Sequence, residues 1–152
     1  MTGPTTPRTF RRSRARAVGD AVTSRFVRLG LVPSTWLLTT RGRRSGLPRT
    51  NPATLVEHDG RRWLVAPYGV VSWVHNVGAD PRVLLRRGLA RQVCVVRAAS
   101  AEEAGPVLQR YVRLSRPTRP YFTATPDSPV ADFVAEADRH PVFELVPYDA
   151  QR

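Results

Sequence analysis

Short β-prone runs separated by turn residues fill the middle of this sequence and constrain its fold more than any other feature. Asp59-Gly60 and Gly88 each lie between two such runs, where they favour tight hairpin turns. Because the runs are short and alternate imperfectly between apolar and polar residues, we expect a small β-barrel with a buried interior. The runs cover residues 36–40, 50–58, 62–67, 82–87, 91–98 and 141–147.

The N-terminal region has a different pattern. Residues 1–7 are rich in Pro and Thr, and we expect a disordered tail there. Between residues 8 and 31, apolar side chains recur at three- and four-residue spacing with arginines on the other faces, which predicts an amphipathic helix. The sequence therefore predicts an α+β fold with one domain over residues 8–152, long enough to bury a core.

Further helices are expected around the barrel. Ser72 can cap a short helix that runs to residue 80. Ser100 and Glu103 have the spacing of a capping box, which predicts a helix to about residue 114. Another helix is expected over 130–139.

Positive charge is concentrated near the start of the chain. Residues 1–50 hold eleven arginines and one acid, Asp20, and so carry +10 of the formal net charge of +12. All the basic residues are arginines, which excludes a catalytic lysine. This part of the chain should attract an anion, such as nucleic acid, an anionic membrane surface or a polyanionic small molecule.

The bend between the first two β-prone runs, residues 41–49, is the strongest candidate site. It crowds arginines together without an acid, which stabilises a folded protein little because like charges repel. Glycines let the backbone approach an anion, and guanidinium forks supply paired donors. We therefore expect an anion to bind at this bend, which holds Arg41, Gly42, Arg43, Arg44, Ser45, Gly46 and Arg49.

A second candidate segment, residues 66–76, follows a strand end. Trp73 is more typical of a residue that packs in the core or lines a pocket wall than of a reactive one. Asn76 could hydrogen-bond a ligand or cap the turn at Gly78. His75 is more typical of a packed or surface residue than of a catalytic one. The histidines are too far apart in sequence to predict a metal site, and Cys94, among valines, predicts a buried inert thiol.

Aromatic residues near the C-terminal third form a third candidate set. Tyr121 and Phe122 follow a proline-broken stretch that could fold over the mouth of a pocket, and Tyr111 lies on the capped helix, where a core role is the alternative. We expect these three residues to shape a substrate pocket.

The motifs together indicate a family. The run LLTTRGRRSGLPRTNP, followed by LVAPYG and by SWVHN with ADPRV, resembles the deazaflavin-dependent nitroreductase family. Those proteins are small split-barrel oxidoreductases that use coenzyme F420. The resemblance implies a split β-barrel of the flavin-binding type with an N-terminal helix and flanking helices.

The resemblance also implies roles for individual residues. In the arginine-rich bend, the residues implied to bind the phosphate and glutamyl tail of F420 are Arg43, Arg44, Ser45 and Arg49. Trp73 and Asn76 would stand near the edge of the deazaflavin. The residues implied along the ribityl chain and ring are Asn51, Pro52, Ala66, Pro67 and Tyr68. Many members have a longer, lysine-containing loop after the third strand, whereas APYGVVS is short and has no lysine.

The implied reaction is hydride transfer from reduced F420 to a quinone, nitro compound or activated alkene. The coenzyme carries the chemistry, so no catalytic side chain is assigned. The partner is then a small-molecule electron acceptor, and the chain is a cytoplasmic monomer or dimer.

Other interpretations remain open at this point. A split-barrel enzyme that uses FMN is one, and a non-catalytic protein that binds an anionic ligand, nucleic acid or a membrane surface is another. Nucleic acid is not expected, because no aromatic residues alternate with the arginines of the bend. Peripheral contact of the helix at 8–31 with the inner face of a membrane would be compatible with the enzyme.

Overall fold

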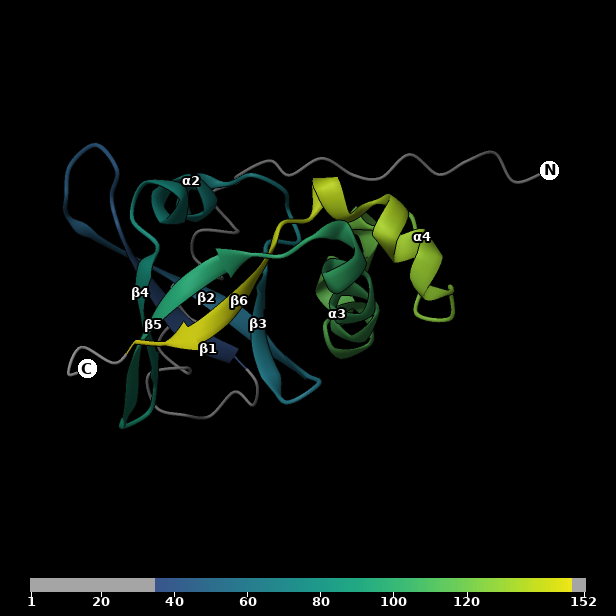
Figure 1. Cartoon of the computed structure of the whole chain (residues 1–152), viewed down its shortest axis with the longest axis horizontal. Coiled ribbons are helices and arrows are strands. Elements are labelled where there is room, and N and C mark those ends of the chain that lie inside the picture. Colours follow the sequence, from purple (N-terminus) through teal and green to yellow (C-terminus); the bar gives the residue numbers. More distant parts are fainter. Residues whose placement is uncertain (1–34, 149–152) are drawn as a thin grey trace.

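A closed antiparallel barrel forms the centre of the molecule. The computed structural model describes residues 35–148, so the tail expected at 1–7 and the helix expected at 8–31 lie outside the described residues. The strands are hydrogen-bonded in the order β1-β2-β3-β6-β5-β4 (Figure 1). They are β1 (Thr35–Arg41), β2 (Pro48–His58), β3 (Arg61–Val65), β4 (Arg82–Arg87), β5 (Ala90–Ala98) and β6 (Val142–Pro147). The predicted small barrel is confirmed.

The turn between β1 and β2 is tighter than the sequence predicts. β2 begins at Pro48, which lies opposite Arg41, and Arg49 lies opposite Thr40. Proline is tolerated at the first position of a strand, where the missing N–H removes little of the ladder. The bend expected over 41–49 is therefore a shorter connection of residues 42–47, which we call the β1–β2 loop.

Helices cover one end and one side of the barrel. α2 (Ser72–Ala79) lies over the barrel, and α3 (Ala101–Leu114) and α4 (Val130–Ala135) lie together beside it (Figure 1). The predicted capping box is formed, because Ser100 Oγ accepts the N–H of Glu103 and Glu103 Oε1 accepts the N–H of Ser100. The structure also contains two 3-10 turns, η1 (Arg116–Tyr121) and η2 (Ala137–Arg139).

Two helix expectations are wrong in detail. Ser72 is the first residue of α2, and Val71, with an extended backbone and no side-chain hydrogen bond, is its N-cap. The helix expected over 130–139 ends at Ala135 and is followed by η2, because Glu136 adopts φ −107° and ψ 10° between them. The break turns Glu136 inward, where it is 2% exposed.

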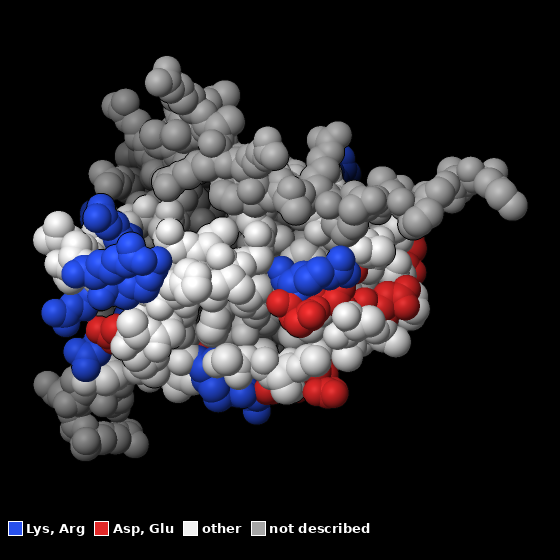
Figure 2. All heavy atoms as spheres, turned by 90° about the horizontal axis from the view of Figure 1, so that it is seen from above, with Lys and Arg blue, Asp and Glu red and all other residues white. Residues whose placement is uncertain are grey.

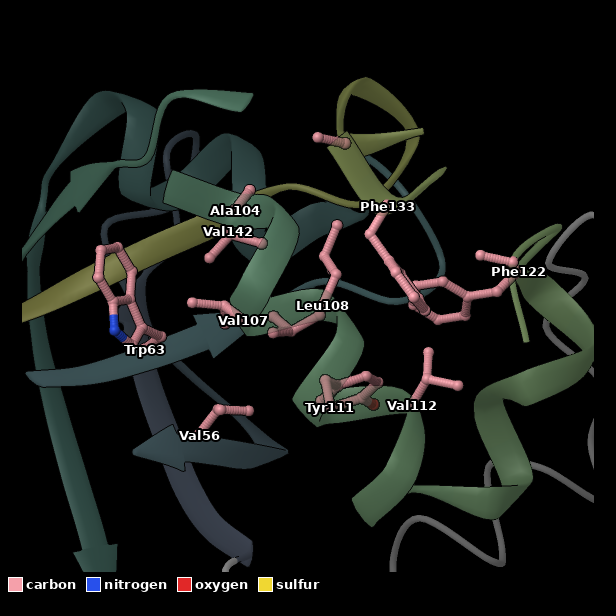
Figure 3. Close-up of a cluster of buried hydrophobic side chains, with 13 residues drawn as sticks. Val56, Trp63, Ala104, Val107, Leu108, Tyr111, Val112, Phe122, Phe133 and Val142 are labelled. Atoms are coloured by element: carbon pink, nitrogen blue, oxygen red, sulfur yellow. The ribbon is translucent and has the colours of Figure 1, made fainter. Parts of the chain in front are cut away.

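Two hydrophobic cores hold these elements together. The first fills the barrel and includes Leu38, Leu64, Leu85 and Leu145, with Trp73 of α2 reaching into it. The second lies between the barrel wall and the layer of α3 and α4 (Figure 3). It contains Val56, Trp63, Val65, Ala104, Val107, Leu108, Tyr111, Val112, Phe122, Ala124, Phe133, Ala137 and Val142. The barrel therefore supports α2 directly through its core.

Candidate functional site

An open cleft of about 700 Å³ separates the β1–β2 loop and the start of β2 from α2. Its lining residues are Gly42, Arg43, Arg44, Ser45, Pro48, Arg49, Thr50, Asn51, Ser72 and Asn76. Three structural elements therefore meet around one polar hollow, at the place where the sequence predicts an anion site.

Two glycines give the β1–β2 loop its shape. The N–H of Gly42 donates to Leu47 O at 2.8 Å, and the N–H of Gly46 donates to Gly42 O at 2.8 Å. Gly46 has φ +70°, a conformation that L-residues rarely adopt. A Cβ on Gly42 would lie 2.7 Å from Ser45 Oγ. Any larger residue at Gly42 would have to displace this part of the loop.

Asn76 of α2 ties the loop to the helix. Asn76 is 3% exposed, and its Oδ1 accepts from Arg43 N at 3.2 Å and from Arg43 Nη1 at 3.1 Å. Its Nδ2 donates to Thr40 Oγ1 at 3.1 Å. Because these bonds use both ends of the amide, Asn76 positions Arg43 and leaves less capacity to bind a ligand directly.

The cleft is strongly cationic. Arg44 and Arg49 are exposed, and neither side chain forms an ion pair or hydrogen bond within residues 35–148. Figure 2 shows basic side chains gathered at the end of the molecule from which the β1–β2 loop projects. Like charges held this close favour the binding of an anion.

The cleft brings together part of the predicted residue set. Arg43, Arg44, Ser45, Arg49, Asn51 and Asn76 line it, while Pro52, Ala66, Pro67, Tyr68 and Trp73 are not among its lining residues. Trp73 is 8% exposed and packs in the barrel core, with its ring centroid 5.8 Å from that of Phe143. Sequence reasoning missed Thr50 and Ser72 as lining residues, although both flank residues that it singled out.

Ala66, Pro67 and Tyr68 belong to the segment of residues 66–71 that connects β3 to α2. The ring of Tyr68 meets that of Tyr121 edge-on, with centroids 4.8 Å apart. Pro67 O accepts a hydrogen bond from His140 Nδ1 at 2.8 Å. This β3–α2 segment is therefore held against the helical layer before it enters α2.

Two kinds of feature are absent from the described residues. Within residues 35–148, no three His, Cys, Asp or Glu side chains lie close enough to bind a metal ion. His75 is exposed on α2, and Cys94 is fully buried. In the same range, no helix combines the length and apolar character needed to cross a membrane.

Comparison with known proteins identifies the family. The family model described as F420H(2)-dependent quinone reductase matches residues 8–135. The chain belongs to this family. It is an oxidoreductase that uses the deazaflavin coenzyme F420. The family assignment thus selects F420 over FMN, the other coenzyme that the sequence left open.

Solved structures share the split-barrel fold of this reductase. One, described as an F420-H2 dependent reductase (FDR-A), is 28% identical with a TM-score of 0.54, over 74% of this chain and 94% of that chain. Another, described as a domain-swapped dimer, is 27% identical with a TM-score of 0.56, over 88% of this chain and 99% of that chain. A third, described as an F420 reductase, is 15% identical with a TM-score of 0.50, over 80% and 91%, and supports the fold alone.

The aromatic residues expected to shape the acceptor pocket of the reductase lie in different surroundings. Tyr111 and Phe122 belong to the core between the barrel and the helical layer (Figure 3), at 3% and 7% exposed. Burial raises the pKa of Tyr111, and hydrogen bonding to Ser115 and Thr118 opposes that rise. Tyr121 is half-buried, and its ring contacts that of Tyr68, a predicted coenzyme residue.

Proposed function

We propose that the cleft beside the β1–β2 loop binds the phosphodiester and glutamyl tail of F420. The supporting observation is the pair of exposed guanidiniums, Arg44 and Arg49, which have no partner within residues 35–148 and share the cleft with Arg43. Phosphate and carboxylate oxygens are the groups that such guanidiniums bind most strongly. Ser45 Oγ, which accepts the N–H of Leu47 at 3.2 Å, can donate its hydrogen to the same anion.

From this anchor, the rest of the coenzyme would run past Asn51 and Pro52 of β2 toward α2 and the β3–α2 segment. Ser72 lies at the start of α2, where main-chain N–H groups lack partners within the helix and favour an anion. Trp73 would support α2 from the barrel core. Ala66, Pro67 and Tyr68 would border the ring through the β3–α2 segment.

The reaction we propose is reduction of a quinone by reduced F420. When bound, the deazaflavin supplies the hydride, and the protein binds, orients and shields it. A cationic anchor that holds the tail fixes the ring at a defined distance from the acceptor. The family description supports a quinone over a nitro compound or an activated alkene as the acceptor.

A titration of coenzyme fluorescence tests the binding site. Arg44→Ala and Arg49→Ala should each weaken F420 binding by about tenfold or more, the range for a charge-assisted hydrogen bond. Arg91→Ala is the matched control, because Arg91 is exposed on β5 away from the cleft. Equal affinities for the cleft variants and the control would remove the arginines from the site.

A turnover assay tests the acceptor class. Reduced F420 should be oxidised faster with protein than without it when a quinone is present, and faster than with nitroaromatic or activated-alkene acceptors. The Arg44→Ala variant should raise the KM for F420 more than it lowers kcat, because the anchor acts on binding. A preference for nitroaromatics over quinones would contradict this acceptor assignment and leave the coenzyme site intact.

A further inference from the structure

His140 is a buried histidine that the proposed reaction does not use. It is 3% exposed, and its Nδ1 lies 2.8 Å from the carbonyl oxygen of Pro67. Because a carbonyl oxygen only accepts, Nδ1 carries the hydrogen of this bond. The ring stacks on Phe122 with centroids 3.9 Å apart and an interplanar angle of 19°. The imidazole is therefore held in one plane and directed at the β3–α2 segment.

Glu136 closes the other side of the imidazole. His140 Nε2 lies 3.2 Å from Glu136 Oε1 but does not meet hydrogen-bond geometry with it. The carboxylate is itself fixed, since its Oε2 accepts the N–H of Thr123 at 3.2 Å and of Ala124 at 3.0 Å. Arg139 Nη2 lies 3.5 Å from the same oxygen. This arrangement holds the carboxylate behind the ring, so the Nδ1–H donor stays aimed at Pro67.

The β3–α2 segment meets the residues around His140 at other points too. The N–H of Ala66 donates to Pro141 O at 2.8 Å. Gly69 has φ +90°, and a Cβ there would lie 3.4 Å from Arg139 O. The segment then enters α2, whose Asn76 holds Arg43 of the β1–β2 loop. Residues 139–141 thus connect the helical layer to the elements that border the coenzyme cleft.

We propose that His140 is a positioning residue for F420 binding: by holding the carbonyl of Pro67, it fixes the β3–α2 segment along which the coenzyme ring lies. The inference rests on the proposed function, because the segment affects binding only if the coenzyme runs along it. In this role His140 acts through the main chain of Pro67 and needs no contact with coenzyme or acceptor.

Two substitutions that introduce an amide side chain distinguish the contact of Nδ1 with Pro67 from that of Nε2 with Glu136. Asparagine at 140 places an amide donor near the position of Nδ1 and can keep the bond to Pro67. Glutamine places its amide near Nε2, beside Glu136, and loses that bond. We expect His140→Asn to bind F420 within about threefold of the unmodified protein and His140→Gln to bind about tenfold more weakly. His58→Asn, in the β2–β3 hairpin, is the control for loss of a histidine elsewhere.

Hydrogen exchange of the coenzyme-free protein gives a second measurement. The N–H groups of Gly69 and Val71 form hydrogen bonds within the segment, to Ala66 O and Gly69 O. They should exchange faster in His140→Gln than in His140→Asn. Equal affinities and equal exchange rates in the two variants would overturn the inference. If the unmodified protein bound no F420, the proposed function would fail, while the exchange rates would still decide whether His140 positions the segment.

Nuclear magnetic resonance of the unmodified protein tests the bond without a substitution. The Nδ1–H of His140 should give a signal that exchanges slowly with water, because it is buried and hydrogen-bonded. A protonated Nε2 with a bare Nδ1 would overturn the inference even if the glutamine variant did not fold.

Discussion

Asn76 Oδ1 accepts two hydrogen bonds from Arg43, one from the main-chain N at 3.2 Å and one from Nη1 at 3.1 Å. A buried amide on α2 thereby sets the path of the β1–β2 loop, although 33 residues separate the partners in sequence. The contact holds one guanidinium of the cleft in place, so Arg44 and Arg49 are presented from a fixed loop. This relationship allows a direct test of whether loop order contributes to coenzyme binding.

Replacing Asn76 with alanine should weaken F420 binding by about tenfold and lower the free energy of unfolding by about 1–3 kcal/mol. The stability loss arises because Arg43 N and Thr40 Oγ1 lose a buried partner. Gln109→Ala is the matched control, since it removes a side-chain amide that donates to Ser128 O at 3.0 Å outside the cleft. Fluorescence titration and chemical denaturation measure the two quantities. Unchanged affinity in Asn76→Ala would show that the contact between Asn76 and Arg43 contributes to stability and not to coenzyme binding.

Replacing Gly42 with alanine should reduce coenzyme affinity more than stability. The added Cβ would lie 2.7 Å from Ser45 Oγ and 3.1 Å from Leu47 O, so the loop must shift. Because the loop is not part of the barrel core, we expect the free energy of unfolding to fall by only about 1 kcal/mol. The melting temperature should then fall by only a few degrees. Gly78→Ala is the control, because no atom beyond the neighbouring residues and backbone of α2 lies within 4 Å of a Cβ there. Normal affinity in Gly42→Ala would mean that the loop shape is not needed for binding.

The sequence predicted the features that depend on residues close together in the chain, namely the strands, the capping box and the arginine-rich bend. The β-prone runs became strands because apolar spacing and turn residues act within a few residues of each other. The capping box of Ser100 and Glu103 followed from their spacing alone. The arginine-rich bend was identifiable because crowded like charges without an acid are unusual in a folded chain.

Contacts between distant segments could not be predicted in the same way. The bond of Asn76 to Arg43 depends on how α2 packs on the barrel, which no short motif encodes. Glu136 fitted a helical pattern over 130–139, but its buried bonds to Thr123 and Ala124 accompany a break in that helix. Tyr111 carried no signal that distinguishes a pocket residue from a core residue, because both are aromatic and lie on an amphipathic helix.

Replacing Tyr111 with phenylalanine should leave the KM for the acceptor unchanged while lowering stability by about 1 kcal/mol, the net value of one hydrogen bond. The ring is buried between α3 and the barrel, and its hydroxyl interacts with Ser115 and Thr118. Tyr148→Phe is the control, because Tyr148 is 39% exposed at the end of the described chain. Steady-state kinetics and thermal unfolding measure the effects. A raised KM for the acceptor in Tyr111→Phe would instead indicate that Tyr111 contributes to the substrate pocket.

Glu103 should make stability depend on pH in the acid range. Hydrogen bonds from Arg97, at 3.0 and 2.7 Å, are the main cause that lowers the pKa of Glu103 from 4.5 to about 2. A carboxyl group with a lowered pKa stabilises the folded state above its unfolded pKa, and this contribution is lost as the pH falls from 4.5 through about 2. Glu103→Gln keeps an acceptor for the N–H of Ser100 but removes the charge. The variant should melt at a lower temperature at pH 7 and show a flatter decline on acidification. If the melting temperatures of the two proteins fell equally with pH across that range, the ion pair of Glu103 with Arg97 would contribute nothing to the pH dependence of stability.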